Sequence, residues 1–264
     1  MPATLTALKV AELVGTGFIA GYLGGIIGTG GCVLMLPMLV FLMKYPVAQA
    51  IGTTVLAVVW TATFGAISHG KLGNIDYETS AVVLAAGAIG ALAGSVIFAA
   101  IMGYAKVLEL ILGAAFLYAA VRMIYEGIKR IPGSEADHIP GSASAKAAIG
   151  FFIGVLTGIL GLGGGYALVP SFIYLLDAPV HLAVGTSMIS MIPMATVSAS
   201  YKMAQGVTDV LGGTILGLGT IAGVKLGAKT TEKIEPWGIK LIFGVVFLYV
   251  SLKFILMGLG IKLF

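Results

Sequence analysis

The stretch GFIAGYLGGIIGTGGCVLMLP, residues 17–37, decides the fold, because it recurs later in the chain as GFFIGVLTGILGLGGGYALVP, residues 150–170. The two copies lie at a constant offset of 133 residues, and the correspondence continues without a gap as far as residues 95 and 228. In each copy a glycine cluster, GTGG or GLGG, interrupts an apolar segment, and a proline follows six residues later. Two hydrophobic halves that are broken at corresponding glycines are typical of secondary transporters built from internal repeats.

The composition is that of a membrane protein. Of the 264 residues, 59% are hydrophobic and only 10% are charged, whereas soluble domains carry about a quarter charged residues. The mean hydropathy is +1.07, and apolar runs long enough to cross a bilayer recur along nearly the whole chain. The 15 lysines and arginines are scattered between these runs, so we expect the lipid bilayer as a partner and no nucleic-acid binding.

The sequence divides into a first repeat, residues 1–130, a solvated linker, residues 131–146, and a second repeat, residues 147–264. The linker holds two prolines, two glycines, serines and charges of both signs. Each repeat is predicted to contain a glycine-broken first segment and three transmembrane helices. The predicted helical segments are residues 11–27, 32–43, 47–68, 77–101 and 106–129, and then residues 147–160, 165–176, 180–203, 210–229 and 236–259.

The piece that follows each glycine cluster is too short to cross the membrane. At about 1.5 Å per residue, residues 32–43 span about half of a hydrocarbon core of about 30 Å. We therefore interpret each broken segment as a re-entrant hairpin that enters and leaves by the same face. The predicted fold class is an all-α polytopic membrane protein with about eight spans, when each hairpin counts as one.

Basic residues indicate that the repeats have opposite orientations, since the cytoplasmic side carries the excess of lysine and arginine. The basic residues that flank the linker and the last loop of the second repeat are Lys129, Arg130, Lys146, Lys225, Lys229, Lys233 and Lys240. The equivalent loop of the first repeat has only Lys106. If the linker is inside, the first-repeat loop is outside, and the two repeats have inverted topology. The two glycine tips would then meet near the middle of the membrane.

The glycine tips are candidate anion sites. A helix that starts directly after a glycine cluster presents backbone N–H groups without partners, and its dipole adds roughly half a positive charge. Glycines also let the backbone wrap closely around an oxyanion. The predicted substrate-binding glycines are Gly28, Gly30, Gly31, Gly161, Gly163 and Gly164. The alternative, that these glycines only permit close crossing of helices, is not excluded by their spacing.

Aligned hydroxyl side chains lie near the start of the span that follows each hairpin. Thr53 and Thr54 correspond to Thr186 and Ser187, and all four could donate to substrate oxygens. Alternatively, they bond to a carbonyl of their own helix or hold a neighbouring helix.

At the other end of the same spans, His69 corresponds to Lys202. These side chains could gather anions or gate the pathway, and a histidine could also take up a coupling proton. The alternative is that both are interfacial anchors whose charged ends reach the headgroups. Asp76 and Asp209 also correspond, and we expect them to form turns or helix caps.

No arrangement of residues indicates an enzyme. The three histidines, His69, His138 and His181, lie in separate loops or helix ends, and no nucleophile, base and acid occur in a catalytic pattern. We therefore expect no catalytic activity, no metal and no cofactor. The single cysteine, Cys32, excludes an intramolecular disulfide, and its functional role is left open.

The two quoted repeats, each followed by an Ile51-Gly-Thr-Thr or Val184-Gly-Thr-Ser stretch, resemble the TauE/SafE sulfite exporter family of membrane permeases. The resemblance implies a multi-pass permease of the plasma membrane that moves small sulfur-containing oxyanions such as sulfite or organosulfonates. It also implies that the tip glycines, Thr53 and Thr186 are functional positions. Rocking of one repeat against the other would expose the anion to each side in turn.

Two other functions are left open by the sequence: a passive anion channel of the same architecture, and a non-transporting membrane scaffold. The sequence also leaves open the identity of the anion, the direction of transport, the coupling ion and the oligomeric state, for which a homodimer is one alternative.

Overall fold

The computed structural model describes residues 7–130 and 136–261, and all regular secondary structure in these residues is helical. The first part of the chain forms α1 (Ala7–Ile27), α2 (Cys32–Pro37), the π-helix η1 (Met38–Leu42), α3 (Val47–Lys71), α4 (Tyr77–Ile101) and α5 (Ala105–Ile128). The second part forms α6 (Ala143–Leu160), α7 (Gly165–Leu175), α8 (Val180–Ala204), α9 (Val210–Thr231) and α10 (Pro236–Gly258). Each predicted helical segment therefore has a counterpart in the structure.

The largest differences from the predicted boundaries lie at the starts of α1 and α6. Helix α6 begins at Ala143, inside the predicted linker, because Ser142 caps it: the Ser142 hydroxyl accepts the N–H of Ala145 at 3.3 Å. The linker residues 131–135 lie outside the described residues. Within the first hairpin, the helix continues past Pro37 as the π-helix η1.

Seven helices of the described residues are long and apolar enough to cross a membrane, namely α1, α3, α4, α6, α8, α9 and most of α10. Helix α5 has 24 residues, and its sequence contains four charged residues. The continuous piece Cys32–Leu42 and helix α7 are shorter apolar helices. The chain is thus an all-helical multi-pass membrane protein, and the seven qualifying helices compare with about eight spans predicted.

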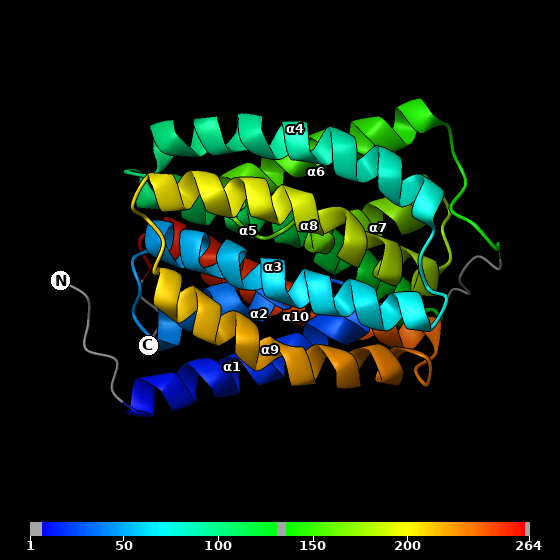
Figure 1. Ribbon diagram of the computed structural model, residues 1–264, viewed down its shortest axis with the longest axis horizontal. Coiled ribbons are helices and arrows are strands. Elements are labelled where there is room, and N and C mark those ends of the chain that lie inside the picture. The colour runs from blue at the N-terminus through cyan, green and yellow to red at the C-terminus, as the bar shows by residue number, and fades with distance from the viewer. Residues whose placement is uncertain (1–6, 131–135, 262–264) are drawn as a thin grey trace.

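Corresponding helices make corresponding contacts. The sequence repeat relates α1 to α6, α3 to α8, α4 to α9 and α5 to α10. Helix α1 packs against α9, and its counterpart α6 packs against α4; likewise α3 packs against α9, and α8 against α4. The central pair α3 and α8 and the pair α5 and α10 each join a helix to its own counterpart. In Figure 1, α4 and α6 form one edge, α1 and α9 form the other, and α3 and α8 lie between them.

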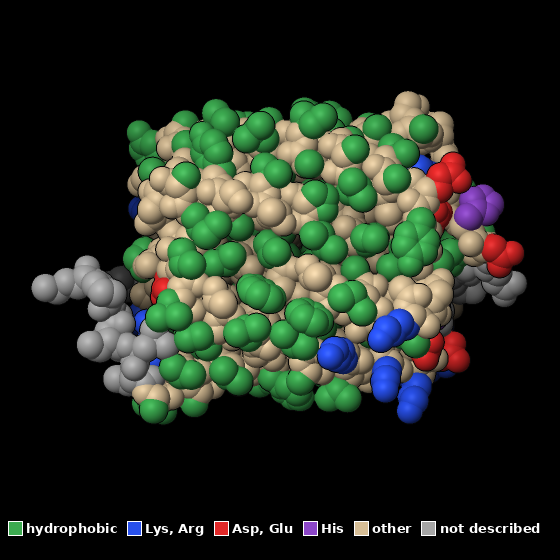
Figure 2. Space-filling model, in the orientation of Figure 1, with side chains coloured by type: hydrophobic (Ala, Val, Ile, Leu, Met, Phe, Trp, Pro, Cys, Tyr) green, Lys and Arg blue, Asp and Glu red, His purple; other side chains and the backbone are tan. Residues whose placement is uncertain are grey.

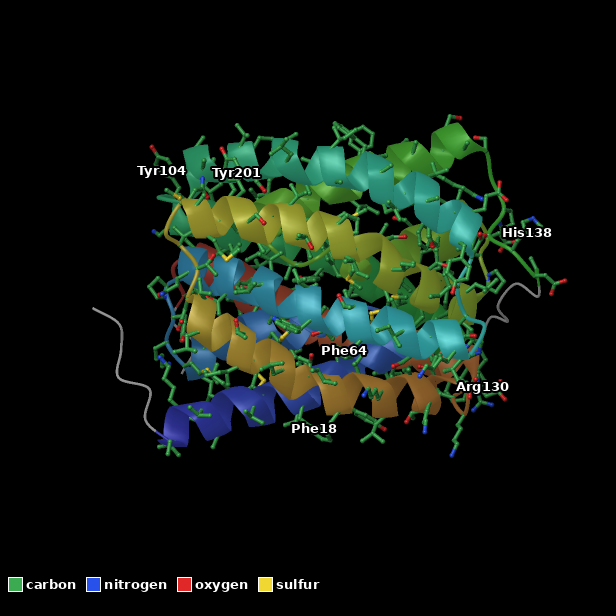
Figure 3. All side chains as sticks on the ribbon, viewed as in Figure 1. Phe18, Phe64, Tyr104, Arg130, His138 and Tyr201 are labelled. Carbon is green, nitrogen blue, oxygen red and sulfur yellow. The ribbon has the colours of Figure 1, made fainter. Side chains whose placement is uncertain are left out.

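Corresponding helices also run in opposite directions along the long axis. Helices α1 and α3 begin at the left of Figure 1, whereas α6 and α8 begin at the right. Tyr104, which precedes α5, lies at the left end, and Arg130 and His138, which precede α6, lie at the right end (Figure 3). In Figure 2, hydrophobic side chains cover the middle of the molecule, and charged side chains gather toward its ends. This distribution places the long axis across the membrane.

Two glycine stripes make the closest helix crossings. Gly17, Gly21 and Gly25 of α1 face α9, and Gly150, Gly154 and Gly158 of α6 face α4. A Cβ atom added to Gly21 would lie 2.5 Å from the carbonyl oxygen of Thr220, and one added to Gly154 would lie 2.2 Å from that of Gly87. Only glycine permits such contact between backbones. The tip glycines Gly31 and Gly161 also pack closely, since added Cβ atoms would lie 2.6 Å from the carbonyl oxygen of Ala20 and 2.5 Å from that of Ile51.

A first prediction follows from this packing. Gly154→Val should lower the free energy of unfolding by about 1–3 kcal/mol or more, because the new side chain must push α6 away from α4. Thermal denaturation in detergent should show a melting temperature several degrees lower. The control is Gly15→Val on α1, where an added Cβ atom meets no atom within 4 Å. Equal melting temperatures for the two variants would contradict the close crossing.

Candidate functional site

The two glycine clusters form the tips of two helical hairpins. Hairpin 1 consists of α1 and α2 with η1, and its tip (tip 1) is residues 28–31; hairpin 2 consists of α6 and α7, and its tip (tip 2) is residues 161–164. The backbone φ angles are +76°, +65° and +73° at Gly28, Gly30 and Gly31, and +66°, +69° and +92° at Gly161, Gly163 and Gly164. These values are left-handed, a conformation that side chains with a Cβ atom disfavour. Both tips therefore use the same three-glycine turn.

The tips meet inside the molecule, between α3 and α8. A Cβ atom added to Gly30 would lie 3.3 Å from the sulfur of Met191 and 3.4 Å from a methyl group of Val58. One added to Gly163 would lie 2.4 Å from the same methyl group and 3.4 Å from the same sulfur. Gly165 also contacts tip 1, since its added Cβ atom would lie 2.4 Å from the carbonyl oxygen of Gly28. All residues of both tips are buried.

Backbone N–H groups at both tips lack backbone acceptors. The N–H of Gly28, directly after α1, donates to the carbonyl oxygen of Gly24 at 2.9 Å. The next such bond along the chain runs from the N–H of Leu34 to the carbonyl oxygen of Gly31. Tip 2 repeats this pattern, from Gly161 to Thr157 and then from Ala167 to Gly164. Between these bonds, the amides of residues 29–33 and 162–166 have no backbone acceptor in the described part of the chain. Each hairpin thus presents a run of free donors beside the positive end of a helix dipole.

Hydroxyl groups without partners surround the tips. Five buried hydroxyls in this region have no hydrogen-bond partner among the described residues, those of Thr29, Thr54, Thr157, Tyr166 and Ser190. The hydroxyl of Thr157 lies 2.9 Å from the position that a Cβ atom on Gly164 would take, so it faces tip 2. Buried polar groups are normally hydrogen-bonded. The five hydroxyls without partners therefore mark the surroundings of the tips as a candidate binding site for a polar ligand.

Only Thr54 of these five hydroxyls was predicted from the sequence. Thr157 and Ser190 correspond to Gly24 and Ala57 in the first repeat, so the comparison of the repeats gave no signal for them. The free hydroxyls lie at both tips, but the second repeat supplies three of them, at Thr157, Tyr166 and Ser190. The site is therefore less symmetric than the glycine motif.

The other three predicted hydroxyls have protein partners. Ser187 donates to the carbonyl oxygens of Gly28 at 2.9 Å and Val184 at 2.7 Å, so it contacts tip 1 directly. Thr53 accepts the N–H of Asp209 at 3.1 Å, and Thr186 accepts the N–H of Asp76 at 2.9 Å. These threonines fasten the loops before α9 and α4. Their contact with substrate stays a prediction.

His69 and Lys202 occupy equivalent places beside the two hairpins. His69 Nε2 bonds the carbonyl oxygen of Gly25 at 2.9 Å, and Lys202 donates to the carbonyl oxygen of Gly158, the counterpart of Gly25. Each side chain thus satisfies a carbonyl in the last turn before a tip. Both are fully buried, with 0% exposure, so the interpretation as interfacial anchors is wrong. A role in gating or in gathering anions stays a prediction.

Asp76 and Asp209 are helix caps, as predicted. Asp76 accepts the N–H of Thr79 and so caps α4, while Asp209 accepts the N–H of Gly212 and caps α9. Asp76 also accepts the N–H of Ile139 at 2.8 Å, which joins the segment before α6 to α4. Burial alone would raise the pKa of Asp76, but the hydrogen bonds from Thr79 and Ile139 and the charge of Lys146 hold it below its usual value.

Comparison with known proteins agrees with this architecture. The family model for the sulfite exporter TauE/SafE matches residues 13–254. The chain belongs to the TauE/SafE family. It is 28% identical to the probable membrane transporter protein YunE of Bacillus subtilis (strain 168), over 94% of this chain and 97% of YunE. It is 27% identical to the probable membrane transporter protein MJ0441 of Methanocaldococcus jannaschii, over 93% and 96% of the two chains. No solved structure matches.

Membership of the TauE/SafE family makes the chain a membrane transporter, since the family consists of transporters and not of enzymes. In the described residues, no group of three or more His, Cys, Asp or Glu side chains is placed to hold a metal ion. The donors at the tips are amides and hydroxyls. Such donors bind oxygen atoms of an anion, and the protein needs no covalent chemistry for this role.

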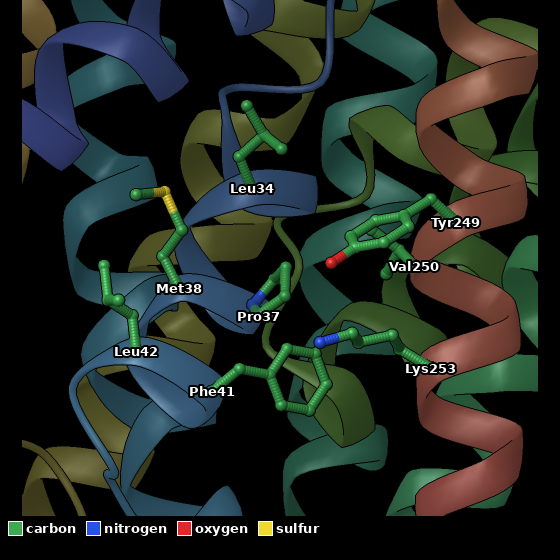
Figure 4. Close-up of a pocket in the computed structure, with 8 residues that line it drawn as sticks. All are labelled: Leu34, Pro37, Met38, Phe41, Leu42, Tyr249, Val250 and Lys253. Carbon is green, nitrogen blue, oxygen red and sulfur yellow. The ribbon is translucent and has the colours of Figure 1, made fainter. Parts of the chain in front are cut away.

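A groove approaches tip 1 from the side, between hairpin 1 and α10 of this TauE/SafE protein (Figure 4). Its volume is about 340 Å³. The lining residues are Leu34, Pro37, Met38, Phe41, Leu42, Tyr249, Val250 and Lys253. The lining is apolar except for the Tyr249 hydroxyl and the Lys253 ammonium group, which lies 4.7 Å from the centre of the Phe41 ring. The groove reaches Leu34, three residues beyond Gly31, but the tips themselves stay buried.

The cap at Asp76 generates a pH-dependent prediction. Asp76→Ala should lower the free energy of unfolding by about 1–2 kcal/mol at neutral pH, because α4 loses its cap and Ile139 loses its acceptor. A carboxylate whose pKa is lowered on folding stabilises the protein above its unfolded pKa of about 3.9, and this stabilisation is lost as the pH falls through the folded value. The difference in melting temperature between wild type and variant should therefore narrow below about pH 3.

The matched control for this measurement is Asp137→Ala, since Asp137 is exposed. It should have the same melting temperature as the wild type at both pH values. A difference between wild type and Asp76→Ala that stays constant with pH would show that the carboxylate charge has no part in the cap.

Proposed function

We propose that this TauE/SafE protein is a secondary transporter that moves small sulfur-containing oxyanions, such as sulfite or organosulfonates, across the plasma membrane. The anion binds between the two glycine tips near the middle of the membrane. The observation that carries the proposal is the meeting of two equivalent tips with free amides and free hydroxyls in one buried place. The choice of sulfur chemistry rests on the description of the family as sulfite exporters.

The architecture supports two inverted-topology repeats, residues 1–130 and 147–264. Corresponding helices run in opposite directions, so that hairpin 1 starts from the left end and hairpin 2 from the right end of Figure 1. Each hairpin is then re-entrant, and three spans follow it. The end that carries Arg130 and His138 faces the cytoplasm, in agreement with the excess of basic residues near it.

The anion would be held by neutral dipoles in a low-dielectric surrounding. The amides of residues 29–33 and 162–166 have no backbone acceptor in the described part of the chain, and the hydroxyls of Thr29, Thr54 and Thr157 add donors. Preformed donors bind an anion more strongly when water is excluded. Tip 1 and tip 2 can therefore contribute from opposite sides to one anion.

The closed arrangement of the tips supports a carrier. Gly165 packs directly against tip 1, and both tips are buried, so the tips are closed to solvent in this arrangement. For transport, the tips must separate from one another toward one face at a time. This is the movement that alternating access requires, and it distinguishes the proposal from a passive channel that stays open.

Transport in proteoliposomes tests the proposal. Labelled sulfite or an organosulfonate should be taken up, and unlabelled substrate on the far side should accelerate the exchange. Gly30→Val and Gly163→Val should each lose about tenfold or more of this flux, because a clash of more than about 1.4 kcal/mol lowers affinity tenfold. The Gly163 variant would place a Cβ atom 2.4 Å from Val58.

Gly206→Val is the matched control for these glycine variants. Gly206 has a φ angle of +72°, like the tip glycines, but a Cβ atom added there meets no atom within 4 Å. It therefore reproduces the backbone strain without the obstruction. Equal flux in all three variants would defeat the assignment of the site, and uptake without acceleration by unlabelled substrate would indicate a channel.

A second prediction concerns the free hydroxyl of Thr54. Because this oxygen has no protein partner, Thr54→Val should leave the melting temperature unchanged or raise it. The same variant should weaken anion binding about tenfold, since a hydrogen bond to a charged group is worth about 1.5–3 kcal/mol. Thermal denaturation measures the melting temperature, and titration calorimetry measures the affinity. The control is Thr214→Val, because the exposed Thr214 hydroxyl bonds the carbonyl oxygen of Val210 in its own helix. Unchanged affinity in Thr54→Val would remove Thr54 from the site.

A further inference from the structure

Lys202 is a buried amine without a carboxylate partner among the described residues. The residue is fully buried, and its ammonium group lies 4.4 Å from the centre of the Phe98 ring. In the described part of the chain, no Asp or Glu oxygen lies within 4 Å of it. Ionisable side chains inside a membrane protein are costly, and they usually pair with one another or mark the path of an ion. No described carboxylate is placed to neutralise protonated Lys202, so that role is left to a bound anion.

The Lys202 side-chain nitrogen lies close to tip 2. Lys202 donates to the carbonyl oxygen of Gly158, which is three residues, or about 4.5 Å of helix rise, before Gly161. It also donates to the hydroxyl of Ser198 at 2.9 Å, and Ser198 donates to the carbonyl oxygen of Thr157 at 3.4 Å. The hydroxyl of Thr157 has no partner and faces Gly164. The hydrogen bonds of Lys202 thus reach the backbone of Thr157, whose hydroxyl faces tip 2.

The equivalent place in the first repeat holds a histidine instead of a lysine. His69 bonds the carbonyl oxygen of Gly25 through Nε2, which must carry the hydrogen because a carbonyl only accepts. Its Nδ1 atom is buried without a partner, so an added proton there would be an unsatisfied donor. A neutral side chain is therefore enough to satisfy the carbonyl before tip 1. The lysine at this place in the second repeat can carry a positive charge in addition to donating a hydrogen bond.

The other buried charged side chains lie away from the tips. Glu109 and Glu126 are near the two ends of α5, while Lys146 and Lys240 are near the starts of α6 and α10. Lys240 and Glu126 form an ion pair at 2.9 Å. When protonated, Lys202 is consequently the one positive charge among the described side chains around the tips.

We propose that Lys202 balances the charge of the transported anion, and that the site therefore selects singly charged oxyanions over doubly charged ones. This inference rests on the proposed binding of an anion between the tips. With one monoanion bound beside protonated Lys202, the two charges cancel. A dianion of similar size would leave one uncompensated negative charge in a low-dielectric place, which is unfavourable. Sulfonates and hydrogensulfite belong to the favoured class, and sulfate belongs to the excluded one.

The test compares methanesulfonate with sulfate, which differ in charge but share a sulfur atom with oxygens around it. Titration calorimetry on the full chain in lipid nanodiscs, at constant ionic strength and neutral pH, should give at least about tenfold tighter binding of methanesulfonate, a difference of about 1.4 kcal/mol. Lys202→Gln should weaken methanesulfonate binding and reduce the preference, whereas Lys202→Arg should keep the preference. Lys225→Gln removes an exposed lysine and should behave as the wild type.

The outcomes separate this inference from the proposed function. Equal or tighter binding of sulfate by the wild type would overturn charge selection, while the anion site itself would stand. Unchanged affinity and preference in Lys202→Gln would show that Lys202 is only a cap for α6. Binding of neither anion by the wild type would defeat both proposals. The comparison within the wild type decides the question even if Lys202→Gln does not fold.

Discussion

A helix that ends inside a membrane leaves backbone carbonyls and amides without partners, and this structure is organised around two such ends. The carbonyl side of each break is satisfied by side chains from the surrounding helices. His69 and Thr231 bond the last carbonyls of α1, Ser187 bonds that of Gly28, and Lys202 bonds that of Gly158. The amide side of each break is left open. This difference gives the buried centre a surplus of hydrogen-bond donors, which supports the proposed binding of an anion there.

The long helices could be predicted from the sequence because their signals are local. For α4, the predicted and observed boundaries are the same, since Asp76 caps its start and an apolar run continues to Ile101. The glycine tips were found for a related reason: two copies of a three-glycine turn stand out when the chain is compared with itself. Length, hydrophobicity and repetition can be read without knowing which helices are neighbours.

The surroundings of the tips depend on tertiary contacts and could not be predicted in the same way. Thr157, Tyr166 and Ser190 have no polar counterpart in the first repeat, and nothing local indicates that their hydroxyls lack partners. Thr53 and Thr186 occupy corresponding positions in the two repeats, which suggested contact with substrate. In the structure, their hydroxyls accept the N–H groups of Asp209 and Asp76. His69 and Lys202 are likewise buried because the hairpins cover the ends of α3 and α8. Sequence alone suggested that these ends lie at the membrane surface.

The exchange of contacts between the repeats bears on which parts can move as units. Hairpin 1 belongs to the first half of the chain, yet its glycine stripe is in backbone contact with α9 of the second half; hairpin 2 is joined to α4 in the same way. Rigid groups defined by close packing therefore do not coincide with the two halves of the sequence. Any displacement of α9 carries tip 1 with it, and any displacement of α4 carries tip 2. The division of the sequence into two repeats therefore differs from the division of the structure into closely packed groups. Each hairpin belongs to one repeat by sequence and packs against a helix of the other repeat.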